Sequence, residues 1–238
     1  MVGREMVRGA ELRSVIAQQT ELNAAVNTFK DTYDGLPGDL SNAPSFGWPL
    51  PEQGYGVRAG DGILQSSNGT TNNSSTNVPG QETTHFGYQL SAAGLIKQRI
   101  LQPPIAQLVG PGLPAQPASW LRDYLLTVNN SASNLFWLPW SDSRSNYYSL
   151  LEVPVVQYVY GPDPSALDSL GLPFTPKEAQ SIDLKFDDGS PHTGNIRALS
   201  YNYFHINFIS PIGWGCAASA AAYVVSDTKS CGLQIKIQ

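Results

Sequence analysis

The chain has 238 residues, of which 41% are hydrophobic and 14% are charged, and this composition supports a packed core and excludes wholesale disorder. Lys and Arg number 14 against 19 Asp and Glu, a formal net charge of -5, which argues against a dedicated DNA- or RNA-binding surface because such a surface needs a basic excess. The least polar stretch, residues 216–225, is far shorter than the roughly 20 apolar residues of a membrane span.

A long helix is predicted over residues 4–34. Apolar and aromatic side chains recur there at steps of three and four residues, which places them on one stripe of an α-helix about 45 Å long. Gly35 is expected to take the left-handed conformation after the last turn, and Pro37 prevents continuation. The stripe is sparse before Ala10, so we expect the first turns to project from the core. The side chains expected to pack on the core are Leu12, Val15, Ile16, Leu22, Val26, Phe29 and Tyr33.

Short helices and strands, separated by irregular loops, are predicted in the rest of the chain. The expected helices cover residues 83–93, a short stretch at 120–125, and residues 176–186. Aromatic and β-branched residues predict strands over residues 135–140, 147–160, 195–198, 203–208, 221–225 and 233–237. A long helix followed mainly by strands predicts an α+β fold, in which the N-terminal helix packs on an antiparallel β-sheet with large irregular loops.

Two cysteines, Cys216 and Cys231, lie close together near the C-terminus. Their proximity predicts one disulfide that closes a short loop, which needs an oxidising compartment; the alternative is a pair of reduced, buried thiols. No secretory signal opens the chain. We therefore expect that the native N-terminus has been removed.

No catalytic constellation is recognisable in the sequence. The histidines are scattered, the cysteines lack the spacing of a redox pair, and neither a Gly-x-Ser-x-Gly elbow nor a glycine-rich phosphate loop is present. We expect no enzymatic activity and no cofactor. Asp183, Asp187 and Asp188 are weak calcium candidates because carboxylates near a turn can bind Ca²⁺, although acidic residues are also common at helix ends.

Aromatic residues offer a second candidate binding site. Trp48, Trp137, Trp140, Tyr147 and Tyr148 would suit a flat sugar-binding surface, whereas aromatic residues at this density more often form a core.

The run FKDTYDGLPGDL, residues 29–40, closes the predicted helix and resembles bacterial type IV pilin-like proteins, including type II secretion pseudopilins. In that family a Phe-x-x-x-Tyr-x-x-Leu-Pro-Gly-Asp sequence closes the helical spine. Two further segments are similar to the same family, ETTHFGYQLSAAGLI at residues 82–96 and TPKEAQSIDLKFDDGSPHTGNIRA at residues 175–198. The pair Cys216 and Cys231 stands where such proteins often join their C-terminal region.

The resemblance implies a pilin-like fold, with residues 1–35 as the C-terminal half of the spine helix and residues 36–238 as a globular head. It implies a structural subunit of an extracellular or periplasmic filament, a pilin or pseudopilin, that assembles through its N-terminal helix. The implied partners are other copies of the chain, related pilins and the inner-membrane assembly machinery, and the native protein is anchored in the inner membrane before assembly. No nucleic-acid partner is expected. The alternative is a minor or tip pilin that acts as an adhesin or ligand-binding module.

The family's apolar N-terminal stretch is missing from this chain, so we expect a soluble form that begins partway along the spine helix. Glu5 does not lie in such a stretch, and the role of the family's glutamate is not carried over to it. Candidates for salt bridges between subunits lie on the part of the helix expected to project: Arg4, Glu5, Arg8 and Glu11.

Overall fold

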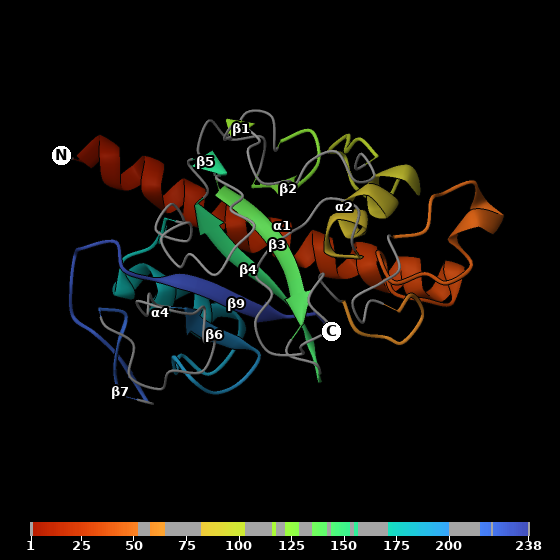
Figure 1. Ribbon diagram of the computed structural model, residues 1–238. Helices are drawn as coiled ribbons and strands as arrows, with labels where there is room; N and C mark the ends of the chain where they lie inside the picture. The colour runs from red at the N-terminus through yellow and green to blue at the C-terminus, as the bar shows by residue number, and fades with distance from the viewer. Residues whose placement is uncertain are drawn as a thin grey trace.

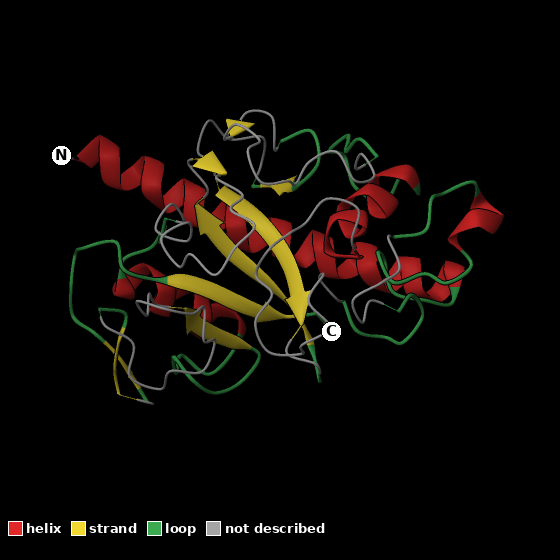
Figure 2. Ribbon diagram, viewed as in Figure 1, coloured by secondary structure: helices red, strands yellow, loops and turns green. Residues whose placement is uncertain are grey.

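The computed structural model describes residues 2–51, 58–64, 82–102, 116–117, 122–128, 135–141, 144–152, 155–156, 171–199, 215–219 and 221–237. The fold is α+β: a long N-terminal helix, α1 (Val2–Tyr33), crosses one face of an antiparallel sheet (Figure 1). Two shorter helices, α2 (Glu82–Ala92) and α4 (Pro176–Phe186), both contact α1. A 3-10 turn, η1 (Ala43–Phe46), follows the far end of α1 (Figure 2).

The main sheet has five strands in the order β2-β3-β4-β9-β6, and every neighbouring pair is antiparallel. Its strands are β2 (Leu126–Thr127), β3 (Leu135–Ser141), β4 (Asn146–Glu152), β9 (Gly232–Lys236) and β6 (Ile196–Leu199). Two small antiparallel pairs lie outside it, β1 (Gln116–Pro117) with β5 (Val155–Val156) and β7 (Ala217–Ser219) with β8 (Ala222–Tyr223). Pro139 occupies a part of β3 that pairs with β4 but not with β2, as expected for a residue without an N–H group.

The register places apolar side chains on both faces of this sheet. On the α1 side, Trp137 is opposite Leu150, Leu150 is opposite Leu233, and Ile196 is opposite Ile235; all five belong to the main core, which α1 joins. A second apolar cluster includes the alternate β3 residues Phe136 and Leu138, which point to the opposite face because side chains alternate along a strand.

Helix α1 ends one residue earlier than its sequence suggests. Asp34 rather than Gly35 takes the left-handed backbone conformation, with φ of 56°, and its N–H donates to the carbonyl of Lys30 at 2.9 Å. An aspartate tolerates this conformation better than most residues do. Gly35 has a different constraint, since a Cβ there would lie 2.6 Å from a methyl carbon of Leu40.

The expected contact between α1 and the core is seen for most of the stripe. Val15, Leu22, Val26 and Phe29 are buried, and Leu12 and Tyr33 are partly buried against the same core. Ile16 differs, because it is only half-buried and does not belong to the main core cluster; one residue along a helix turns the side chain by about 100°, away from Val15. Gln19, which interrupts the apolar stripe, is buried.

Two other expectations need correction. Residues 122–125, expected in a short helix, form turns that lead into β2, and there the carbonyl of Leu125 accepts a hydrogen bond from Gln98 instead of a helical partner. The long strand expected over residues 147–160 ends at Glu152, and Val155–Val156 pairs in a different sheet. The strand expected over residues 203–208 and the stretch 157–160 lie outside the described residues.

Candidate functional site

The turn after α1 fits directly against the first turn of α2. Gly38 has φ of +87°, and its N–H donates to Oε1 of Gln89 at 2.6 Å. A Cβ on Gly38 would lie 2.2 Å from the carbonyl oxygen of Glu82 and 3.0 Å from the nitrogen of Phe86. Only glycine permits both the backbone conformation and this distance, so the Leu-Pro-Gly-Asp sequence sets the position of α2 against the end of α1.

The next residue, Asp39, holds a second loop. Its carboxylate accepts backbone hydrogen bonds from Gly60, from Asp61 at 3.3 Å and from Gly62 at 2.6 Å, and only 2% of the residue is exposed. Burial raises the pKa of Asp39 to about 6, and the backbone donors of Gly60 and Gly62 oppose this effect. Sequence reasoning had assigned no role to Asp39, although it belongs to the Leu-Pro-Gly-Asp motif.

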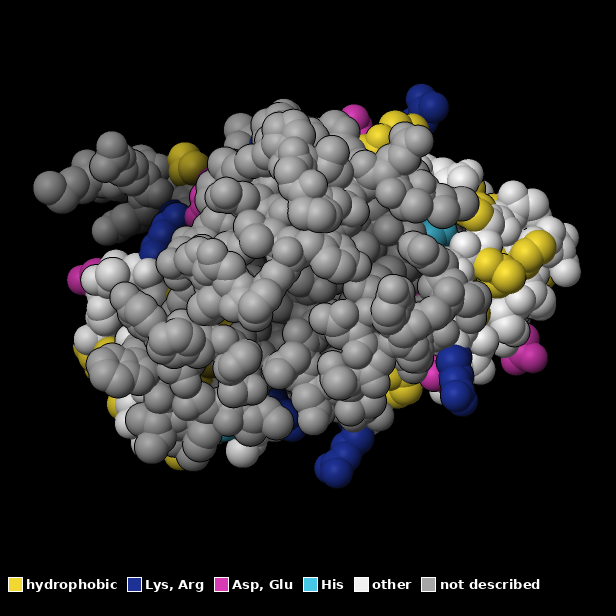
Figure 3. Space-filling view, in the orientation of Figure 1, with side chains coloured by type: hydrophobic (Ala, Val, Ile, Leu, Met, Phe, Trp, Pro, Cys, Tyr) yellow, Lys and Arg dark blue, Asp and Glu magenta, His cyan; other side chains and the backbone are white. Residues whose placement is uncertain are grey.

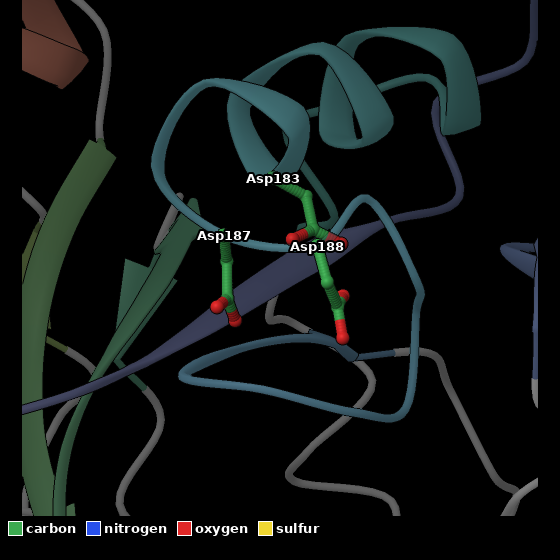
Figure 4. A group of neighbouring side chains, drawn as sticks. All are labelled: Asp183, Asp187 and Asp188. Carbon is green, nitrogen blue, oxygen red and sulfur yellow. The ribbon is translucent and has the colours of Figure 1, made fainter.

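The three calcium candidates are brought together at the C-terminal end of α4 (Figure 4). This helix starts with a capping box between Thr175 and Glu178. Carboxylate oxygens of Asp183, Asp187 and Asp188 lie within 4.8 Å of one another; the first residue is buried, the second half-buried and the third exposed. Oxygen atoms in such an arrangement are ligands that Ca²⁺ accepts.

Each of these carboxylates also has a partner within the protein. Asp183 accepts hydrogen bonds from the N–H of Gly189 at 3.2 Å and from the hydroxyl of Tyr223 at 2.8 Å. Asp187 accepts from the backbone of Asn195 and of Ile196, and Asp188 accepts from Ser190 and Thr193. These bonds explain the cluster in structural terms, because together they join the end of α4 to β6 and β8.

The electrostatics of the cluster follow from its graded burial. Burial raises the pKa of Asp183 to about 6; the neighbouring carboxylates of Asp188 and Asp187 add to this rise, whereas the bonds from Tyr223 and Gly189 oppose it. Burial also raises the pKa of Tyr223, followed by the charge of Asp183. The exposed Asp188 behaves in the opposite way, because the hydrogen bonds from Thr193 and Ser190 lower its pKa.

Among the residues proposed for subunit contacts, Arg8 binds within its own chain. Its guanidinium donates to both carboxylate oxygens of Glu178, at 2.5 and 2.9 Å, and to the carbonyl of Pro173 at 2.8 Å. It lies 5.7 Å from the ring centre of Phe174 and also donates to Glu11 at 3.0 Å. Arg8 therefore fastens α1 to the start of α4, which differs from the expectation that it lies on a free part of the helix.

The other three assembly candidates differ in their surroundings. Glu11 is exposed and bound to Arg8, whereas the side chains of Arg4 and Glu5 lie outside the described residues.

The pair of Arg8 and Glu178 also sets the pKa of the glutamate. Burial raises the pKa of Glu178, but the hydrogen bonds from Arg8 and Thr175 outweigh this effect and the pKa lies below its ordinary value. The 170 residues between Arg8 and Glu178 leave no local sequence signal for this pair.

The cysteines form a disulfide, with 5.1 Å between the Cα atoms of Cys216 and Cys231. Both are fully buried. The backbone of Cys231 exchanges two hydrogen bonds with Phe174, each 3.0 Å long, at the entrance to α4. The disulfide thus attaches the β7–β8 pair to the part of the head that also holds Arg8.

The described aromatic side chains of β3 and β4 lie in the core, which was the alternative to a flat sugar-binding surface. Trp137, Tyr147 and Tyr148 are buried, and the indole N–H of Trp137 donates to Oε1 of Gln18 on α1 at 3.1 Å. Trp48 is half-buried, with its ring 5.8 Å from that of Phe29. The side chain of Trp140 lies outside the described residues. The core alternative is the correct one for Trp137, Tyr147 and Tyr148, because apolar clusters cover both faces of the sheet and neighbouring residues of a strand are therefore buried on opposite faces.

This chain matches no protein-family model, no curated protein and no solved structure. In the part of the chain that the structure describes, no helix combines the length and apolar character needed to cross a membrane.

Proposed function

We propose that this protein is a structural subunit of a type IV pilus-like filament, a pilin or pseudopilin, that assembles through its N-terminal helix. The proposal combines the sequence resemblance with the positions that the resembling segments occupy in the fold. Residues 29–40 form the end of α1 and the turn beyond it, residues 82–96 include α2, and residues 175–198 include α4 and most of β6.

These segments serve one structural purpose, which is to hold a long helix on a sheet. Gly38 contacts the first turn of α2, and the carboxylate of Glu178 in α4 binds Arg8 of α1. Buried side chains of α1, such as Val26 and Phe29, complete the attachment. A load applied to the helix would therefore reach the head through three separate contacts.

The observation that carries the proposal is the division of α1 into two parts. From Val15 to Phe29 the helix contributes buried residues to the core, whereas its first turns extend beyond the sheet (Figure 1). In this projecting part Met6 is 68% exposed and Val7 is 62% exposed. A helix with one part in the head and one part projecting with apolar side chains suits bundling with the same helix of other subunits.

The proposed partners are other copies of the chain and related pilins, and the inner-membrane machinery that assembles them. The proposed location is an extracellular pilus or the periplasm, with the inner membrane as the site before assembly. The buried disulfide supports an oxidising location. Glu11, exposed near the projecting turns, is the described candidate for a salt bridge between subunits.

The test is a shearing experiment on cells that produce the protein with its native N-terminus. An antibody against the head is used to compare the sheared surface fraction with the cell envelope. Filaments that contain abundant protein in the sheared fraction would identify a major pilin, traces there would identify a minor subunit, and retention in the envelope would identify a secretion pseudopilin. Cytoplasmic protein with free thiols at Cys216 and Cys231 would refute the proposal.

A further inference from the structure

A cavity of about 150 Å³ lies beside the first part of α1 that packs on the head. Its apolar lining comes from Leu12 and Val15 of α1, from Val128 and Leu135, and from Phe174. An apolar cavity of about this volume accommodates a benzene ring. The cavity, which we call the α1 cavity, therefore has the size and chemistry to take one aromatic side chain.

Two charged groups stand at the α1 cavity with their side chains available for a partner. Glu152 and Lys229 line it, and none of the described residues forms a hydrogen bond or ion pair with either side chain. Of the other charged lining residues, Arg8 is paired with Glu178 and with Glu11.

The opposite end of α1 carries an aromatic side chain that matches this cavity. Phe46 is 42% exposed, and it is the one aromatic residue in the set of large exposed hydrophobic side chains found among the described residues. Its ring lies 5.0 Å from that of Tyr33 and 5.5 Å from that of Trp48, which hold it in place. Figure 3 shows apolar side chains exposed at this end of the molecule (Figure 3).

The surroundings of Phe46 also suit the charges at the α1 cavity. Residues 41–51 contain no charged residue, so insertion of Phe46 buries no ion. The exposed carboxylate of Asp34, next to Tyr33, has no hydrogen bond or ion pair with any described residue. It is complementary to Lys229 at the cavity, since the two are exposed charges of opposite sign and neither pairs with a described residue.

We propose that Phe46 of one copy enters the α1 cavity of the next copy, with Asp34 of the first facing Lys229 of the second. Leu12 and Tyr33 are separated by 21 residues of helix, about 30 Å, so the two surfaces cannot meet within one molecule. A contact between two different surfaces of identical molecules does not close on itself unless a ring forms, and it generates an open filament. This inference rests on the proposed filament function and extends it by naming the contact between neighbouring copies.

The test keeps Phe46 and places one cysteine at each surface of the same chain, Ser45→Cys with Ser14→Cys, since Ser45 is exposed next to Phe46. Ser14 lines the α1 cavity and is half-buried, and the native cysteines are fully buried in their disulfide. Mild oxidation of the assembled protein is followed on a non-reducing gel. We expect a ladder of trimers and longer species, because each chain can be linked at both ends, whereas either single variant stops at dimers.

The matched control is the pair Leu184→Cys with Ser14→Cys, since Leu184 is 61% exposed and belongs neither to the lining of the α1 cavity nor to residues 41–51. Thiols held in contact have effective concentrations in the millimolar range, so in micromolar protein the Ser45 pair should be linked on the order of a hundredfold faster. Equal rates for the two pairs would overturn the inference. Electron microscopy of the same samples separates the two proposals: filaments without the ladder contradict the contact alone, whereas neither filaments nor ladder contradicts both.

A second measurement does not depend on cross-linking. Phe46→Ser should reduce filament yield at least about tenfold and lower the melting temperature by only a few degrees, because the half-exposed ring contacts Tyr33 and Trp48 at the edge of the core but contributes mainly to the contact between copies. Leu50→Ser, in the same uncharged segment and 38% exposed, is the control and should assemble normally. Equal losses in both variants, or normal assembly of Phe46→Ser, would contradict the inference.

Discussion

Replacement of Gly38 by alanine tests how the end of α1 is joined to α2. The new Cβ would lie 2.2 Å from the carbonyl oxygen of Glu82, and this oxygen belongs to the backbone of a helix that cannot move alone. Overpacking of this kind costs about 1–3 kcal/mol, and the positive φ of +87° adds about 1–2 kcal/mol for a residue with a side chain. We expect a loss of about 2–5 kcal/mol in the free energy of unfolding.

The matched control is Gly94→Ala. Gly94 also has a positive φ, of +70°, but no atom lies within 4 Å of the position of its Cβ, so only the backbone cost of about 1 kcal/mol remains. Urea denaturation followed by circular dichroism gives both free energies, and for a chain of this size each kcal/mol corresponds to about 2–4 °C in melting temperature. If the two variants unfold within about 0.5 kcal/mol of each other, the close approach of Gly38 to α2 does not constrain the fold.

Three further predictions concern contacts that hold the head together. Arg8→Ala should cost about 2 kcal/mol in unfolding free energy, because it removes charge-assisted hydrogen bonds to Glu178; an unchanged urea midpoint would contradict this. Burial gives Asp39 a pKa of about 6 in the folded state against an ordinary 3.8, so the folded state binds the proton more tightly. This group should therefore raise stability as the pH falls from 7 to 4, by up to about 3 kcal/mol, and Asp39→Asn should remove this part of the pH dependence. Replacement of Cys216 and Cys231 by serine should cost about 3 kcal/mol for the 15-residue separation, measured by thermal unfolding without reductant.

Controls separate these effects from general damage. Arg13→Ala changes an exposed arginine on the same helix and should leave stability within about 0.5 kcal/mol. The pKa of Asp183 is also raised to about 6 by burial, so this residue should contribute a similar pH dependence. Only the double variant, Asp39→Asn with Asp183→Asn, should remove most of the pH dependence. If the unfolding free energy of the wild type decreased as the pH was lowered from 7 to 5, the backbone donors around Asp39 would outweigh the effect of its burial.

The helices α1, α2 and α4 could be predicted closely because their signals are local. A stripe with steps of three and four residues marked α1 to within two residues at its start, and Pro176 marked the first turn of α4. β7 had no such signal, since its residues are Ala217, Ala218 and Ser219. Small side chains carry little strand preference. The position of β7 is set instead by its pairing with β8 and by the disulfide of the preceding residue.

The contacts that attach α1 to the head could not be predicted from the sequence, because they join residues that are far apart along the chain. Arg8 finds Glu178, and Gln18 finds Trp137, over separations of 170 and 119 residues. A sequence shows that Arg8 is charged but not which surface its helix turn will meet. For the same reason, alternation predicted that β3 has two faces but not that Trp137 lies on the face beneath α1, so its burial appeared only in the structure.

The position of β9 has a consequence for the order in which the sheet can form. This strand follows the other described strands in the chain and yet lies between β4 and β6 in the sheet (Figure 1). Until residues 232–236 have been made and have joined the sheet, β4 and β6 each have an open edge, and open edges can pair with other chains. Pairings between distant residues also form slowly. The sheet is therefore completed only after nearly the whole of this sequence has been made, and until then the edges of β4 and β6 remain exposed to other chains.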